Sequence, residues 1–387
     1  MTAISFRRQL KLVQNNKQYE PYTYYFTVGL LSAFFGVALW LLFSLRLLNF
    51  YPRQAHANLM FFGFLWSFVA GFLMTAIPKM TGAIKAQKWE IFLGLVFLFV
   101  QWIFNFENFV KTSAWLYLGQ LLFLLIFVVR RFVEKKKMPF EGFVFMPFAF
   151  MMGLVGLLLY IYDNSRTNAM YTLAGQAFVL NLICGVGSRL IPVLSRLPSA
   201  LSPDIPSDSF QRGKRLIHFL TLAVLLNVSF IIEVMGWEIA GYSIRTFVFG
   251  WISVRLFRFF QKPLTRTFIG WGLKAGIAGI FLSYFALATG SVKDSLGHLH
   301  VMFIAGLGLI TLMVATRVTV AHGGGSLDLE LRSKTIFAVI SCFLLSALLR
   351  AFVGMQLNTV FIFSASVAFL LALVLWSSKL AKLMWKI

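Results

Sequence analysis

The chain has 387 residues, of which 59% are hydrophobic and only 12% are charged. A water-soluble domain carries about twice that share of charged residues, so this composition excludes a soluble globule and indicates an integral membrane protein. The formal net charge of +22 would suggest nucleic acid as a partner of a soluble protein. Here the basic residues fall in short segments between apolar runs, where they act as topology signals. We therefore expect contact with membrane lipid and none with nucleic acid.

Cysteine usage and the N-terminal residues narrow the class further. Cys184 and Cys342 are the only cysteines, and each lies in an apolar run without a second cysteine nearby. This excludes a CxxC redox or zinc motif and argues against a structural disulfide. The first twenty residues are basic and contain neither a short apolar region nor a cleavage site, so we expect no removable signal peptide.

Twelve apolar runs follow one another along the chain, each about as long as a membrane-crossing helix, which needs roughly 20 residues. They lie at residues 24–47, 56–77, 90–106, 112–130, 143–162, 168–188, 216–236, 241–260, 268–290, 298–320, 335–353 and 357–378. The series predicts an all-α integral membrane protein with twelve transmembrane helices in a single domain, residues 1–387. The proline-containing loop 188–214 is either a boundary between two six-helix halves or an ordinary loop within one bundle.

The lysines and arginines support this number of helices. When the runs are threaded in alternating directions, 27 of the 35 basic residues fall on the side that carries both termini. A missed helix would reverse this bias from that point onward. Because basic loops stay on the cytoplasmic side, we expect a multi-pass protein of the bacterial inner membrane with both termini in the cytoplasm.

Three histidines lie near the starts of the second and tenth runs, at the outer side of the membrane. His298 and His300 are two residues apart, so helical geometry turns them to nearly opposite sides of the tenth helix. An imidazole in an apolar helix is costly without a partner, and His56 and His300 on facing helices would suit the two axial positions of a haem iron. A hydrogen bond between these two helices is the alternative. His298 either ligates a second haem or metal or caps its helix.

Neighbouring residues would complete such a haem site. Met60 and the phenylalanines after His56 supply flat apolar walls, and Gly306 allows the close approach of a helix or a flat ligand. Arg53 and Arg350 lie on the outer side, where they would meet haem propionates, although each is as well explained as an interfacial anchor. Met60 is foremost a packing residue, and a copper-binding thioether is the open alternative.

Other polar residues are interpreted more simply. His322 ends the tenth helix, where the helix dipole favours it; a metal site shared with His218 is the less favoured alternative. Glu233 and Glu238 lie near the predicted outer surface. We expect them to be solvated loop charges and not parts of a buried proton relay.

The segment from Ala55 to Phe62 and the motif His298-Leu299-His300 resemble the second and tenth helices of the haem-copper oxidase catalytic subunit. In that family the second-helix histidine and the second histidine of the tenth-helix pair bind the low-spin haem, and the first histidine of the pair binds the high-spin haem. The twelve helices agree with that fold as well. The family's copper ligands in the sixth and seventh helices are missing, because the sixth run has no histidine and the seventh has only His218 at its cytoplasmic end. We therefore expect neither oxygen reduction nor proton pumping of that type.

The chain more closely resembles the NnrS family of membrane proteins. The similar blocks are His56 to Phe64, Gly71 to Pro78, Thr81-Gly82, Gly187 to Pro192, His300, Gly308, Arg317 to Thr319 and His322-Gly323. The resemblance implies a haem- and copper-containing membrane protein linked to nitric oxide and denitrification. Asn58 stands where that family usually has a second histidine, and His298 is offset from its additional tenth-helix histidine.

Three functions are compatible with this sequence. The first is a haem protein that binds, senses or detoxifies nitric oxide or another small gas, or passes electrons to a redox partner. We expect b-type haem, whereas copper has no clear site. The second is a transporter without haem. Against it, the sequence has no membrane-centred carboxylate or lysine and no matching pair of broken helices. The third is a cofactor or metal assembly factor. The sequence assigns no catalytic residue and leaves open whether the protein is an enzyme.

Overall fold

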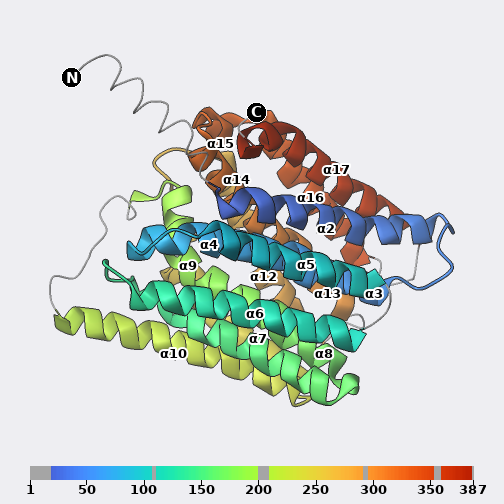
Figure 1. Ribbon diagram of the computed structural model, residues 1–387, viewed down its shortest axis with the longest axis horizontal. Coiled ribbons are helices and arrows are strands. Elements are labelled where there is room, and N and C mark those ends of the chain that lie inside the picture. Colours follow the sequence, from blue (N-terminus) through green and yellow to red (C-terminus); the bar gives the residue numbers. More distant parts are fainter. Residues whose placement is uncertain (1–18, 107–109, 199–208, 291–294, 353–358, 386–387) are drawn as a thin grey trace.

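The long helices of the protein run side by side in one bundle (Figure 1). The structure is a computed structural model that describes residues 19–106, 110–198, 209–290, 295–352 and 359–385. Within these residues the regular structure is helical and no strand occurs. The all-α class predicted from the sequence is therefore confirmed.

The spans follow one another in chain order, and several consist of more than one helical segment. The first four are α2 (Pro21–Ser44); α3 (Arg53–Asn58), η1 (Leu59–Leu65) and α4 (Trp66–Thr81); α5 (Lys88–Phe106); and α6 (Val110–Val133). The next four are η2 (Glu141–Val144) and α7 (Phe145–Tyr162); η3 (Asn164–Arg166), α8 (Thr167–Met170), η4 (Tyr171–Ala177) and α9 (Phe178–Leu194); α10 (Ser209–Val234); and α11 (Glu238–Arg255). The last four are α12 (Phe268–Ala288); α13 (Ser295–Val301), η6 (Met302–Gly308) and α14 (Leu309–Gly323); α16 (Lys334–Phe352); and α17 (Thr359–Trp385), with the short α15 (Asp328–Arg332) before α16.

Eleven spans in the described part of the chain are long and apolar enough to cross a membrane, so the protein is a multi-pass membrane protein. The twelfth predicted crossing, residues 241–260, is α11. It carries Glu238, Arg245 and Arg255 within 18 residues, and its composition alone does not mark it as a span. It packs against both α10 and α12, and Arg245 is fully buried there in an ion pair. The structure is thus consistent with twelve helices in an oxidase-like bundle.

The second, sixth and tenth spans are built alike, because each contains a seven-residue π-helical segment soon after its start. The fifth residue of each segment is a glycine: Gly63, Gly175 and Gly306. A Cβ atom on Gly63 would lie 2.6 Å from Ser32 Cβ, and one on Gly306 would lie 2.5 Å from Ile280 Cγ1. Glycine therefore permits the close approach of a neighbouring helix. Such π segments are rare and occur frequently at functional sites, and here the construction recurs at every fourth span.

The two ends of the bundle differ in character. Figure 1 shows α3, α8 and α13 toward one end, with their continuations α4, α9 and α14 toward the other. We call the first the histidine end, because His56 and His300 lie on α3 and α13, and the second the basic end, because most of the lysines and arginines are expected there. Which end faces the cytoplasm stays a prediction.

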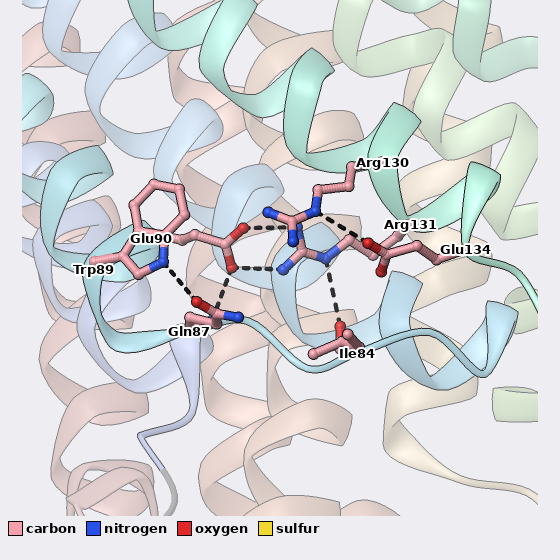
Figure 2. A network of polar contacts seen from close by, with 7 residues as sticks. All are labelled: Ile84, Gln87, Trp89, Glu90, Arg130, Arg131 and Glu134. Atoms are coloured by element: carbon pink, nitrogen blue, oxygen red, sulfur yellow. Dashed lines mark hydrogen bonds and ion pairs between the residues drawn. The ribbon is translucent and has the colours of Figure 1, made fainter.

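A buried ion pair joins α5 to α6 at the basic end (Figure 2). Arg131 donates hydrogen bonds to both carboxylate oxygens of Glu90, at 2.6 and 2.5 Å, and the two side chains are 2% and 3% exposed. The backbone N–H of Gln87 donates to the same carboxylate at 2.8 Å, and Arg131 Nε donates to the carbonyl of Ile84 at 3.4 Å. The pair therefore holds the connection between α4 and α5 against the start of α5 and the end of α6.

Two predictions fall partly or wholly outside the described residues. The proposed boundary at 188–214 overlaps the end of α9 and the start of α10, and residues 199–208 between them are not described. The absence of a signal peptide concerns residues that mostly precede Tyr19, where the description begins. Both stay predictions.

Candidate functional site

A pocket of about 340 Å³ lies at the histidine end of the bundle, where the second, sixth and tenth spans meet. Its walls come from α3, η1, η4, α13 and η6, together with parts of α2, α10, α11, α16 and α17. Aromatic side chains form much of the lining, among them Trp40, Phe61, Phe64, Tyr171 and Phe303. The volume and the largely apolar walls are typical of a small-molecule or cofactor site, which occupies roughly 300–1,000 Å³.

His56 and His300 come together in the wall of this pocket. Their ring centroids are 6.4 Å apart and their planes are within 14° of parallel. An imidazole nitrogen binds a first-row metal at about 2.0–2.1 Å, so two imidazoles on opposite sides of one metal have ring centres about 6 Å apart. The observed separation of 6.4 Å is compatible with two imidazoles that hold one metal ion between them.

The Nδ1 atom of each ring is fixed by a backbone carbonyl. His56 Nδ1 lies 2.8 Å from the carbonyl oxygen of Gly36 on α2, and His300 Nδ1 lies 2.8 Å from that of Leu296, one turn earlier on α13. A carbonyl oxygen only accepts hydrogen bonds, so each Nδ1 carries a proton. In the neutral rings the lone pair is therefore on Nε2, and metal-binding histidines are commonly oriented by this arrangement.

Five of the seven predicted site residues line the pocket: His56, His300, Arg53, Arg350 and Met60. Arg350 is close enough to interact electrostatically with both imidazoles. Arg53 opens α3 one turn before His56. The pocket therefore combines apolar walls, two imidazoles and two guanidinium groups.

The structure does not place His298 and Gly306 in the pocket lining. His298 precedes His300 by two residues on α13, and its backbone carbonyl accepts a hydrogen bond from Ser283 Oγ at 2.6 Å. Gly306 is buried within η6, where it packs against Ile280 of α12. Helical geometry explains the position of His298, because two residues correspond to a rotation of about 200° around the helix axis.

Asn58 is a neighbour of the pocket that takes part in a buried polar network. Its Oδ1 accepts a hydrogen bond from the Tyr171 hydroxyl at 2.8 Å, and its Nδ2 donates to Asn105 Oδ1 at 3.2 Å. Ser113 Oγ donates to the same Asn105 oxygen at 2.5 Å. The network links the second, third, fourth and sixth spans and fixes the ring of Tyr171 at the pocket wall.

Glu233, at the end of α10, also lines the pocket, and the expectation that it is a solvated loop charge is wrong. Its carboxylate accepts hydrogen bonds from Arg245 Nη2 at 2.6 Å and from the Tyr242 hydroxyl at 3.1 Å. The Glu233 and Arg245 side chains are only 9% and 0% exposed. The available signal was Arg245 itself, because an arginine within a membrane helix requires a partner. Glu238 is exposed, as expected, and contributes to the same lining.

The two remaining histidines have other partners, on other helices. Trp251 Nε1 donates to His218 Nε2 at 3.4 Å. His322 contacts Lys79 Nζ, and its ring stacks on that of Tyr22 with centroids 5.4 Å apart. No group of three or more histidine, cysteine, aspartate or glutamate side chains that could hold a metal ion occurs among the residues described.

Comparison with known proteins gives one family. The family described as NnrS protein matches residues 19–387, a range that includes every residue of the pocket. No curated protein matches the chain.

Proposed function

The chain belongs to the NnrS family, and from that premise we propose that it is a haem-binding membrane protein of the nitric oxide response, in which His56 and His300 would together hold one haem. Proteins of this family are linked in general to the response to nitric oxide. The finer assignment rests on the geometry of the pocket at the histidine end.

The observation that carries the proposal is the position of the two Nδ1 atoms, each of which lies 2.8 Å from a backbone carbonyl oxygen. Both Nδ1 atoms donate to backbone carbonyls, so both Nε2 atoms of the neutral rings are acceptors. Two acceptors cannot hydrogen-bond to each other, which argues against a direct hydrogen bond between the two imidazoles of the second and tenth spans. A metal ion bound between the rings would use both lone pairs at once.

A haem iron fits this arrangement better than a bare metal ion. Zinc and copper sites ordinarily require three or four protein ligands, and no such group is found among the described residues. Haem brings four nitrogen ligands of its own and needs one or two from the protein. The aromatic walls suit the faces of a porphyrin, and Arg53 and Arg350 could pair with its propionates.

The residues also indicate what such a site could do. Neither cysteine belongs to a CxxCH sequence, so the haem would be held without a covalent link, as b-type haem is. Bound haem would supply one-electron chemistry and a metal to which gases bind. A gas molecule would have to displace His56 or His300 to reach that metal. The supported roles are therefore electron transfer, or sensing or detoxification of nitric oxide through loss of one histidine ligand.

The direct test is a pyridine haemochrome assay, with metal analysis and optical spectra, on the purified full-length protein and its histidine variants. We expect haem in the wild type and a low-spin spectrum. His56→Ala and His300→Ala should each abolish that spectrum, because each removes one of the two imidazoles that would hold the haem. His298→Ala should change only a gas-binding fraction, if one is present.

The matched controls are His218→Ala and His322→Ala. Each removes an imidazole that is not part of the pocket lining, so the spectrum should stay intact. Full low-spin spectra in both His56→Ala and His300→Ala would refute the ligand assignment. A wild type without haem would refute the proposal as a whole and favour a transporter. Rapid transfer of the haem to apomyoglobin would favour the assembly factor instead. Copper in the metal analysis would show that the protein holds a second metal besides the haem iron.

A further inference from the structure

The pocket that contains the histidine pair also contains a carboxylate that the proposed haem ligation does not use. Glu233 ends α10, its side chain is 9% exposed, and both it and Tyr242 line the pocket. Gln176 of η4 lines the same pocket and accepts a hydrogen bond from the Tyr284 hydroxyl at 2.9 Å. A carboxylate on the wall of a cavity within a membrane span is costly to keep, so it points to a function.

Arg245 is held in place by groups other than Glu233. Its Nε donates to Ser229 Oγ and its Nη2 to the Ser229 carbonyl, both at 3.2 Å. The guanidinium lies over the Phe230 ring, 3.5 Å from the ring centroid. Nη1 has no hydrogen-bond partner among the described residues. Because arginine stays protonated in proteins, its positive charge remains at this place whether Glu233 is ionised or neutral.

In this ion pair only Glu233 can gain or lose a proton, because the charge of Arg245 is fixed. With Glu233 ionised, the pair is neutral overall; with Glu233 protonated, the pair carries one positive charge. An extra negative charge elsewhere in the pocket is expensive in a medium of low dielectric constant. Protonation of Glu233 would compensate for it, because a nearby negative charge favours the neutral form of a carboxyl group.

The other titratable or charged groups around Glu233 are tyrosines, one arginine and one exposed carboxylate. Tyrosines titrate near pH 10 and arginine higher still, and Glu238 is exposed to solvent. The groups on the elements packed against the end of α10, within the described residues, are Arg245, Glu238, Tyr242, Tyr284, Tyr171 and Tyr160. Glu233 is the remaining buried carboxylate of the pocket.

We propose that Glu233 is the proton-exchanging group of the pocket and that its protonation is coupled to the redox state of the bound haem. When a one-electron donor reduces the site, the Glu233 carboxylate takes up one proton from solvent. The same proton leaves when the electron leaves. One electron and one proton enter together, so the net charge of the pocket is unchanged. Arg245 is a positioning residue, and the inference rests on the haem binding proposed above.

The test is a spectroelectrochemical titration of the full-length haem-loaded protein from mildly acidic to mildly alkaline pH. In the wild type we expect the midpoint potential to fall by up to about 59 mV for each tenfold fall in proton concentration, the value for a one-electron couple. Glu233→Gln should remove this dependence. Asp163→Asn removes an exposed carboxylate of the α7–η3 connection and should keep it.

A second variant and a second readout cover the case in which Glu233→Gln does not fold. Tyr242→Phe removes one hydrogen-bond donor to the carboxylate but keeps the carboxyl group itself, so the slope of the dependence should remain. The infrared difference spectrum of the wild type should gain the carbonyl band of a protonated carboxyl group on reduction.

The possible results separate the two proposals. Absence of haem in the wild type refutes the proposed function and this inference with it. If haem is present, a potential that does not change with pH refutes the inference alone. The inference alone is also refuted if the potential of Glu233→Gln still changes with pH, or if the infrared difference spectrum on reduction lacks the carboxyl band.

Discussion

Loss of the carboxylate of Glu90 should destabilise the protein far more than loss of the carboxylate of Glu134. Both are paired with neighbouring arginines of α6, Glu90 with Arg131 and Glu134 with Arg130 (Figure 2). The first pair is almost completely buried, at 3% and 2% exposed, whereas in the second pair the Glu134 and Arg130 side chains are 30% and 47% exposed. The two substitutions Glu90→Gln and Glu134→Gln remove the same chemical group at the same end of the bundle.

The expected difference follows from burial. Breaking a buried ion pair leaves an unpaired charge away from water and costs about 3–5 kcal/mol, and the other hydrogen bond of Arg131 within the described residues is a long one, 3.4 Å to the carbonyl of Ile84. An exposed pair four residues apart on one helix contributes about 0.3–0.5 kcal/mol. We therefore expect Glu90→Gln to cost several kcal/mol and Glu134→Gln less than about 1 kcal/mol.

The assay is reversible unfolding in mixed detergent micelles, followed by tryptophan fluorescence. Hydrogen exchange of the Gln87 amide gives a local readout, because this N–H donates to Glu90 and should lose protection in Glu90→Gln alone. Replacing both charges, as in Glu90→Leu with Arg131→Met, should recover most of the loss, because no charge is left unpaired. Equal losses in the two single variants, or no recovery in the double variant, would contradict the reasoning.

Two further predictions concern packing. A Cβ atom on Gly142 would overlap the carbonyl oxygen of Gly185 on α9, so Gly142→Ala should cost about 1–3 kcal/mol. Gly213→Ala in α10, where nothing lies within 4 Å of the added atom, should be neutral or stabilise by up to about 1 kcal/mol; equal effects in the same unfolding assay would show that the contact is unimportant. Trp376, fully buried on α17, donates to Thr316 Oγ1 on α14 at 2.9 Å, so Trp376→Phe should cost about 1–3 kcal/mol. An unchanged midpoint of thermal unfolding would contradict that value.

The positions of the spans could be predicted well from the sequence. The run predicted at 143–162 is η2 and α7, Glu141–Tyr162, and the run at 268–290 is α12, Phe268–Ala288. Hydrophobicity is a property of each segment, and the bilayer imposes its length. Alternating threading then fixes the depth of each residue, which is why His56 and His300 could be expected at one level.

The orientation of side chains around each helix axis was not accessible in the same way. Glu233 was expected in solvent, but the packing of α10 against α11 brings it to Arg245. The pairing of Arg131 with Glu90, the glycine-containing π segments and the Nδ1 contacts of the two histidines were likewise not predicted. Each residue turns a helix by about 100°, so small shifts in packing change which side chains meet.

The sequence by itself determined the class, the number and order of the spans and the level of the histidines, because these follow from local composition and from the thickness of a membrane. Only the tertiary structure decided that His56 and His300 share one pocket, which of their nitrogens remain available, and that a paired carboxylate lines the same pocket. Those features depend on how all the helices pack together, and no single segment of the chain contains that information.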